Sequence, residues 1–424
     1  MTPSADDPAS GPNASFTIVN ARLLTLAGSP RPRRSGKRGA ATDPLGVIAD
    51  GWLRVVRGRI AGIGAGDPDD RDQTSASAIV DARGRVVLPG FVDCHTHACW
   101  AGQRFDEADM RLAGVPYLEI LARGGGIMNT VRATRAASRD ALVERTLERC
   151  RAALLGGTTT IEVKSGYGLS SADEWKMLEA IRLAAERTPQ RVVPTFLGAH
   201  AKDPANPGYV DEVIETLLPR VAAAFPGIAC DAYCETGAWS LDEATRLFRR
   251  AAALGCPIRV HADQFNSLGT VSEAIALGAR SVDHLEATGI EDLGRLAASA
   301  TIGVALPGCG FHLDNRYANA RAFLDAGGAL AIATNCNPGS SPTTSMAFVI
   351  ALAVRFLKLT PGEAISAATI NAAHVLGLGA EIGSLEVGKR ADVQLLGSRD
   401  ERTLAYEYAN PGPDMVWIGG ERVV

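Results

Sequence analysis

Two histidines separated by a single residue, His95 and His97, give the clearest chemical signal in this chain. They lie at the end of the segment 89–97, which contains the apolar pair Phe91-Val92. Residues two apart on a β-strand point to the same side, so both imidazoles can bind one cation. Nitrogen ligands of this kind suit zinc or iron better than calcium or magnesium. We therefore predict a metal-dependent hydrolase.

The elements that must position these histidines lie between residues 89 and 381, where strand-like and helical patterns alternate. Capping boxes are predicted at Ser171-x-x-Glu174, Ser240-x-x-Glu243 and Thr360-Pro361-x-Glu363. Strands separated by helices in this way indicate an α/β fold with a parallel (β/α)8 TIM-like barrel. The eight predicted strands span residues 91–96, 159–163, 193–199, 228–234, 257–261, 280–284, 302–306 and 329–334.

Polar side chains gather where these predicted strands end. In a (β/α)8 barrel the carboxyl ends of the strands converge on one site. Five of the seven histidines fall in this set, which chance placement does not favour. The candidates are His95, His97, Glu162, Lys164, His200, Glu235, His261, Asp283, His284 and Asn335.

Both ends of the chain read as β-structure. Short β-type runs occur at 52–56, 59–63 and 78–88, and again at 391–396 and 415–424. We therefore expect a small composite β-sandwich domain built from residues 16–88 and 382–424, beside a barrel at 89–381. Residues 1–15 are expected to be a disordered tail, and the basic run 31–38 is assigned no function.

Composition argues for a small-molecule partner. The chain is 46% hydrophobic and 21% charged, with a net charge of −4, so we expect neither nucleic acid nor a membrane as a partner. The N-terminus lacks an apolar signal segment, which predicts a cytoplasmic location. The eight cysteines lack paired metal or disulfide spacings, so we expect reduced, mostly buried thiols.

Longer motifs carry a resemblance to a known family. The run at 157–169, Gly-Thr-Thr-Thr-Ile-Glu-Val-Lys-Ser-Gly-Tyr-Gly-Leu, is joined by Leu-Gly-Ala-His at 197–200, His-Ala-Asp-Gln at 261–264 and Asn-Pro-Gly-Ser-Ser-Pro at 337–342. With these motifs the chain resembles the amidohydrolase superfamily over nearly its full length, and within it the imidazolonepropionase family.

The resemblance implies a hydrolase of histidine degradation that opens the ring C–N bond of 4-imidazolone-5-propanoate to give N-formimidoyl-L-glutamate. It implies one Zn²⁺ or Fe³⁺ per subunit, of a homodimer, held by His95, His97, His261 and the position of Asn335. A metal of this kind lowers the pKa of bound water to about 7, so that hydroxide attacks the ring carbonyl. His284 would stabilise the oxyanion or relay the proton, with Gln264 and Asn335 beside it. The implied substrate contacts are Arg104, Tyr167, His200, Gln264, Asn337, Gly339 and Ser340.

Asn335 departs from the family pattern, which has aspartate at this position. An amide brings no negative charge and cannot accept the proton of the attacking water. Three explanations stay open: an inactivating replacement that traps substrate, a natural variant that uses His284 as the base, or a homologue that has lost activity. We expect family identity with reduced turnover.

Two other functions are weighed. A ring deaminase of the same superfamily commonly needs a glutamate at the position of Gln264, which disfavours that interpretation. A barrel that binds an imidazolone-like ligand without turnover stays open because of Asn335. Binuclear relatives carry a bridging lysine on the fourth strand, whereas Lys164 lies on the second, so one metal ion is favoured.

Overall fold

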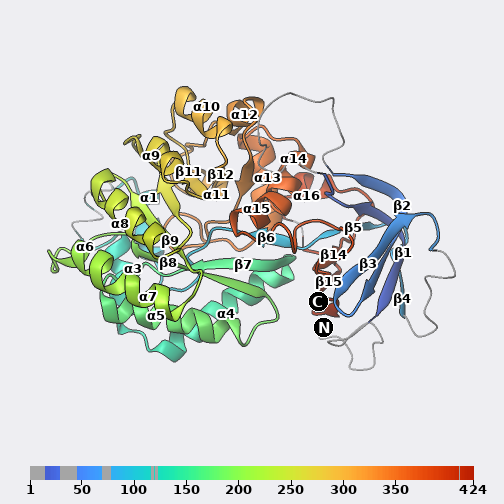
Figure 1. The fold of residues 1–424 in the computed structure, drawn as a ribbon, viewed down its shortest axis with the longest axis horizontal. Coiled ribbons are helices and arrows are strands. Elements are labelled where there is room, and N and C mark those ends of the chain that lie inside the picture. The colour runs from blue at the N-terminus through green and yellow to red at the C-terminus, as the bar shows by residue number, and fades with distance from the viewer. Residues whose placement is uncertain (1–14, 29–44, 69–77, 116–118, 120–122, 410) are drawn as a thin grey trace.

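The computed structural model of the 424-residue chain describes residues 15–28, 45–68, 78–115, 119, 123–409 and 411–424. These residues build two sheets, a barrel on the left of Figure 1 and a mixed β-sheet on the right. The predicted tail, apart from Ser15, and the basic run 31–38 lie outside the described residues.

The barrel is the predicted ring of parallel strands in sequential order. Its sheet closes where the chain after the first strand meets the chain after the last. There Asn335 N donates to His95 O at 3.0 Å, and His97 N donates to Cys336 O at 2.9 Å. The strands are β6 (Phe91–Asp93), β7 (Thr158–Lys164), β8 (Arg191–Ala199), β9 (Ala229–Cys234), β10 (Arg259–Ala262), β11 (Ser281–His284), β12 (Ile302–Ala305) and β13 (Leu330–Ile332).

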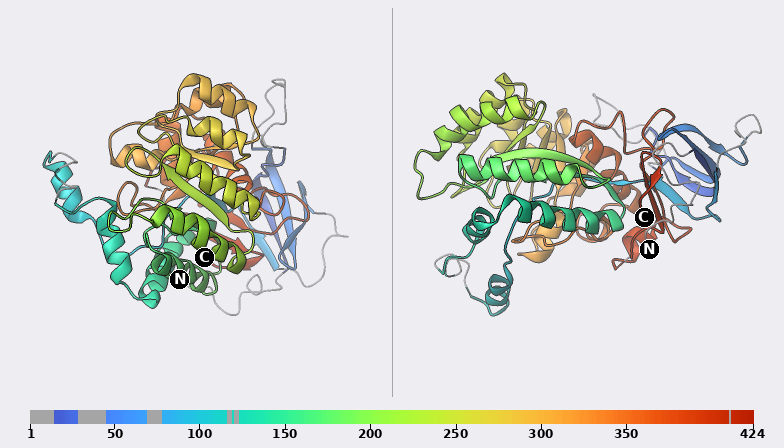
Figure 2. Two further views of the ribbon diagram at one scale, coloured as in Figure 1. Left: turned by 60° about the vertical axis from the view of Figure 1, so that its left-hand side comes forward. Right: turned by 90° about the horizontal axis from the view of Figure 1, so that it is seen from below.

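Helices lie on the outside of these strands, as the two views in Figure 2 show. Their apolar faces pack on the strands in one large hydrophobic core. The helices of this part are α1 (Phe105–Leu112), α3 (Ile127–Ala136), α4 (Arg139–Leu155), α5 (Ser171–Ala185), α6 (Tyr209–Asp211), the π-helix η2 (Glu212–Leu217), α7 (Leu218–Ala224), α8 (Leu241–Ala253), α9 (Thr270–Ala276), α10 (Ile290–Ala298), α11 (Pro307–His312), α12 (Ala320–Asp325), α13 (Met346–Phe356), α14 (Pro361–Ala367), α15 (Ile370–Val375) and α16 (Thr403–Tyr406).

Two of the three predicted capping boxes are confirmed and one is wrong. Ser240 and Glu243 form the box at the start of α8, and Thr360 and Glu363 form the box of α14. At α5 the N-cap is Ser170 instead of Ser171, and it accepts from Asp173 N. Glu174 takes no part in capping, because its buried carboxylate accepts hydrogen bonds from three loop N–H groups instead.

The small β-domain is built from both chain ends, as predicted. Its strands are hydrogen-bonded in the order β16-β15-β14-β5-β1-β2-β3, with β4 paired to β1. Phe16 of β1 stacks on Trp417 of β15 at 5.4 Å in a core shared by the two ends. The strands are β1 (Phe16–Leu24), β2 (Val47–Val56), β3 (Arg59–Ala65), β4 (Ala78–Asp81), β5 (Val86–Pro89), β14 (Val393–Leu395), β15 (Met415–Ile418) and β16 (Glu421–Arg422).

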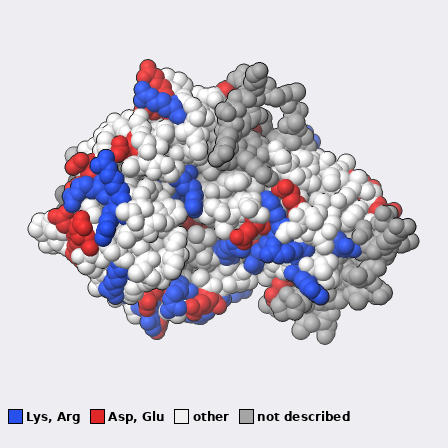
Figure 3. Space-filling view, in the orientation of Figure 1, with Lys and Arg blue, Asp and Glu red and all other residues white. Residues whose placement is uncertain are grey.

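The surface carries both signs of charge. On the face drawn in Figure 3, acidic and basic side chains lie next to one another in several places. All eight cysteines are free and buried, which confirms their predicted burial, and their reduced state stays a prediction. Among the described residues, every helix is too short or too polar to cross a bilayer.

Candidate metal centre and active site

Three histidines meet at the carboxyl end of the barrel. His95 and His97 follow β6, and His261 lies in β10, with its Nε2 3.3 Å from Nε2 of His97. One ring nitrogen from each of the three falls within 4.8 Å of the others, and all three rings are buried. Burial holds the pKa of each ring below its usual value, so the imidazoles are neutral and offer lone pairs. Nε2 of His95 has no hydrogen-bond partner, as fits a nitrogen aimed at a cation.

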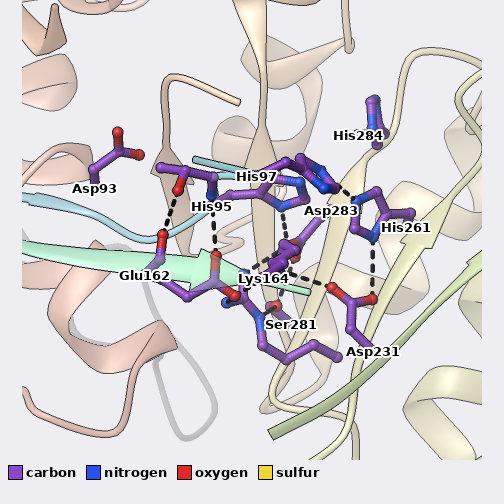
Figure 4. A network of polar contacts seen from close by, with 12 residues as sticks. Asp93, His95, His97, Glu162, Lys164, Asp231, His261, Ser281, Asp283 and His284 are labelled. Atoms are coloured by element: carbon purple, nitrogen blue, oxygen red, sulfur yellow. Dashed lines mark hydrogen bonds and ion pairs between the residues drawn. The ribbon is translucent and has the colours of Figure 1, made fainter. Parts of the chain in front are cut away.

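Two aspartates orient these rings from below, as Figure 4 shows. Asp283 Oδ2 lies 2.6 Å from Nδ1 of His95, and Asp231 Oδ1 lies 3.1 Å from Nδ1 of His261. An ionised carboxylate only accepts hydrogen bonds, so each Nδ1 donates and each Nε2 keeps its lone pair. This carboxylate–histidine arrangement is typical of metal-ligating imidazoles.

The loop after β13 meets Arg104, one of the implied substrate contacts. Asn337 Oδ1 accepts from the backbone N of Gly339 and of Ser340, both at 2.8 Å, and its Nδ2 donates to Asn335 O at 2.6 Å. Asn337 therefore holds the loop together. A Cβ at Gly339 would lie 2.3 Å from Nη1 of Arg104, so the guanidinium packs directly on this loop.

Arg104 is held by a residue that the sequence analysis did not single out. Its Nη2 lies 2.5 Å from Oε2 of Glu107. Glu107 is buried and also accepts from Gly126 N and Asn129 Nδ2, both at 3.0 Å. The guanidinium therefore has one anchored edge, and its Nε is without a hydrogen-bond partner.

Tyr167 and His200 form an aromatic wall beside the metal ligands. His200 stacks on His97 with ring centroids 4.8 Å apart, and Tyr167 lies 5.2 Å from His200. Nδ1 of His200 donates to Gly166 O at 3.0 Å, and burial lowers its pKa to about 3, so the ring is neutral. Glu174 fixes the loop that carries Tyr167 by accepting the backbone N–H groups of Gly166, Gly168 and Leu169.

His284 and Gln264 lie on the other side of the histidine cluster. The ring of His284 is 5.5 Å from that of His261, and its Nδ1 is 3.2 Å from Glu286 Oε1. Its backbone is strained, with φ of +88° followed by +73° at Leu285, a feature that concentrates at functional sites. Gln264 Nε2 donates to Cys309 Sγ at 3.3 Å.

Comparison with known proteins gives the family. Residues 86–423 match the amidohydrolase family. The imidazolonepropionase of Symbiobacterium thermophilum is 49% identical over 389 residues, which is 89% of this chain and 90% of that protein. The imidazolonepropionase of Herpetosiphon aurantiacus is 44% identical over 97% of this chain and 98% of that protein. The chain belongs to the imidazolonepropionase family.

Solved structures agree on the fold of this imidazolonepropionase family member. A triazine hydrolase variant superposes with a TM-score of 0.74 at 18% identity, covering 97% of this chain and 95% of that one. The 5-methylcytosine deaminase from Klebsiella pneumoniae gives 0.73 at 16% identity, covering 96% and 97%. The predicted family and the predicted barrel with its β-sandwich are confirmed, and the three histidines form a cluster that could hold a metal ion in this hydrolase.

Asn335, whose backbone N donates to His95 O, has a side-chain oxygen without a hydrogen bond. It is buried, with φ of +51°, and its Oδ1 has no hydrogen-bond partner. Its Nδ2 lies 3.5 Å from Ser340 Oγ. Asp325, the nearest carboxylate along the chain, is the last residue of α12 and pairs with Arg321, so it does not replace the missing acid.

Several residues that contact the candidate site residues escaped the sequence analysis. Asp231 and Arg259 are charged residues inside apolar strands, a signal that could have identified them. Glu107 and Glu286 lie in helical or loop sequence, where a glutamate is ordinary. Glu235, predicted at the mouth, instead holds a loop by accepting from Phe265 N and Asn266 N at 2.9 and 3.1 Å.

Proposed function

We propose that the protein hydrolyses the ring C–N bond of 4-imidazolone-5-propanoate to give N-formimidoyl-L-glutamate. The observation that carries the proposal is the convergence of three neutral imidazoles, two of them oriented by aspartates. The loop after β13, on which Arg104 packs, completes the site. Relatives at 44–49% identity that are named imidazolonepropionase support the substrate.

His95, His97 and His261 would hold the metal ion, with Asn335 Oδ1 as a fourth oxygen. Bound there, the ion acidifies a coordinated water and polarises the ring carbonyl. Arg104 presents a planar guanidinium to the propanoate carboxylate, because Glu107 anchors only one of its edges. Tyr167 and His200 line one side of the ring, and Gln264, Gly339 and Ser340 supply amide, backbone and hydroxyl groups.

His284 is proposed as the residue that stabilises the oxyanion and relays the proton to the leaving nitrogen. Glu286 accepts a hydrogen bond from its Nδ1, which fixes the ring and leaves Nε2 for the substrate side. Asn335 cannot take up a proton in this site. We therefore propose that turnover is lower than it would be with aspartate at position 335.

We also propose the identity of the metal ion, the oligomeric state and the boundaries of the two domains. Three imidazoles accept either ion, so we propose one Zn²⁺ or Fe³⁺ per subunit. Family precedent supports a homodimer in the cytoplasm. The separate cores of the two sheets support a composite domain at 16–88 and 382–424 beside a barrel domain at 89–381. Metal analysis and light scattering of the purified protein test the first two.

The activity test follows the ultraviolet absorbance of freshly prepared 4-imidazolone-5-propanoate. We expect metal-dependent loss of absorbance with formation of N-formimidoyl-L-glutamate, abolished in His261→Ala and retained in His312→Ala, a histidine outside the cluster. Saturable binding without turnover would support a ligand-binding protein instead. Ammonia release from an aminated ring, with the imidazolone untouched, would support a deaminase.

A further inference from the structure

The ligands of the proposed metal site carry no negative charge of their own. The proposed ligands are three neutral imidazoles and the buried amide of Asn335. A divalent ion in a buried, neutral environment is unfavourable unless a nearby anion compensates its charge. Apart from a bound hydroxide, compensating charge can come only from charged residues that contact the ligands.

Five ionisable side chains form a connected network of ion pairs next to the histidines, and Figure 4 labels four of them, Glu162, Lys164, Asp231 and Asp283. They are Glu162 and Lys164 of β7, Asp231 of β9, Arg259 of β10 and Asp283 of β11. Each is at most 1% exposed. Three carboxylates stand against two cations, so the network has a formal charge of −1 and faces the metal site.

Each of the two basic residues forms ion pairs with two of the three carboxylates. Lys164 Nζ lies 2.6 Å from Glu162 Oε1 and 2.8 Å from Asp231 Oδ2. Arg259 reaches Glu162 Oε1 at 3.0 Å and Asp283 Oδ2 at 2.6 Å. Glu162 is thus the common partner that joins the two cations.

The remaining hydrogen bonds leave little freedom at the aspartates. Ser281 Oγ donates to Asp283 Oδ1 at 2.6 Å, while its own oxygen accepts from Arg259 Nε at 3.0 Å. Glu162 Oε2 accepts from the backbone N of Thr96, which lies between His95 and His97, at 3.0 Å. The network is therefore tied both to the imidazoles and to the backbone that carries them.

We propose that Asp231 and Asp283, which contact Nδ1 of His261 and of His95, supply negative charge for the cation, and that Lys164, Arg259 and Glu162 are positioning residues that hold both carboxylates against these rings. The proposal rests on the metal site proposed above but not on its substrate. It predicts that metal affinity depends more on the two buried aspartates than on position 335, where the family pattern places its acid.

The test measures zinc affinity of metal-depleted, full-length protein by competition with a chromophoric chelator. Asp231→Asn and Asp283→Asn keep the side-chain shape and are each expected to weaken zinc binding about 10- to 100-fold. Asn335→Gly removes the amide and suits the positive φ, and it is expected to weaken binding less than either. Asp392→Asn, a buried carboxylate of the β-domain, is the matched control and should leave zinc affinity unchanged.

A charge-rescue variant separates electrostatics from simple damage to the fold. Asn335→Asp in the Asp283→Asn background returns one negative charge to the site and should recover most of the lost zinc affinity. Chemical unfolding of the zinc-free proteins measures any loss of stability caused by Asp283→Asn. We expect Asn335→Asp to restore the zinc affinity of this variant but not its free energy of unfolding.

The outcomes are distinguishable. Failure of the wild-type protein to bind zinc or iron overturns the metal site and this inference together. Zinc binding by the wild type, with Asn335→Gly as damaging as the aspartate variants, overturns the inference alone. If an aspartate variant does not fold, the zinc affinity of Asn335→Gly still tests the inference. A tenfold loss of zinc affinity in Asn335→Gly would contradict the assignment of the charge to the two aspartates.

Discussion

Replacement of Gly339 by alanine tests whether the guanidinium of Arg104 binds the substrate carboxylate. The new Cβ would lie 2.3 Å from Arg104 Nη1 and 3.1 Å from its Cζ. The guanidinium must move by about 1 Å to restore van der Waals contact. Because it is the far end of a flexible side chain, this movement has little effect on the stability of the fold.

The displacement should act on the reaction instead. A shift of about 1 Å in a positioning group lowers the rate by about 10²-fold, which corresponds to ~2.7 kcal/mol. We expect kcat/KM for 4-imidazolone-5-propanoate to fall by that order, with zinc content and Tm unchanged. The assay is the initial rate of absorbance loss, measured on this substrate and on an imidazolone without the carboxylate.

The matched control is Gly294→Ala in α10, where a Cβ meets open space and alanine favours the helix. It should keep wild-type kinetics on both substrates. Our reasoning predicts that Gly339→Ala loses activity only on the carboxylate substrate. Wild-type kcat/KM in this variant, or an equal loss on both substrates, would refute the role of Arg104.

Three further predictions follow from the same structure. Asn335→Asp supplies a proton acceptor beside the histidines and should raise kcat by about 10²-fold or more while tightening metal binding; equal turnover of the two forms would contradict the role of this position. Removal of metal with a chelator should abolish activity and lower Tm, and added zinc should restore both; full activity of metal-free protein would exclude the proposed chemistry. The Arg22 side chain holds the pKa of Glu401 below its usual value, so this pair stabilises the fold above the unfolded-state pKa of about 4.3 and less as the pH falls through the folded-state pKa. Glu401→Gln should therefore lower the free energy of unfolding by about 1 kcal/mol at pH 7, and urea titrations should show the difference closing in acid.

Local pattern in the sequence determined the architecture and the histidines of the candidate metal site. The eight barrel strands lie where short apolar runs predict them, because a strand buried on both faces needs apolar residues over its whole length. His95 and His97 lie just beyond β6 and still reach one cluster with His261, as their spacing of two predicts for an extended chain. The β-runs of the two chain ends also pair as expected, since each leaves an apolar face that the other covers.

Tertiary structure alone decided how those ligands are supported. His95 meets Asp283 across 188 positions of sequence, and His261 meets Asp231 across 30. Glu174 does not form the capping box that the sequence predicts, because its buried carboxylate accepts hydrogen bonds from three loop N–H groups. Periodicity reports which face of an element is buried. It does not report which charged groups from different strands meet inside a closed barrel, because that depends on the register of strands distant in sequence.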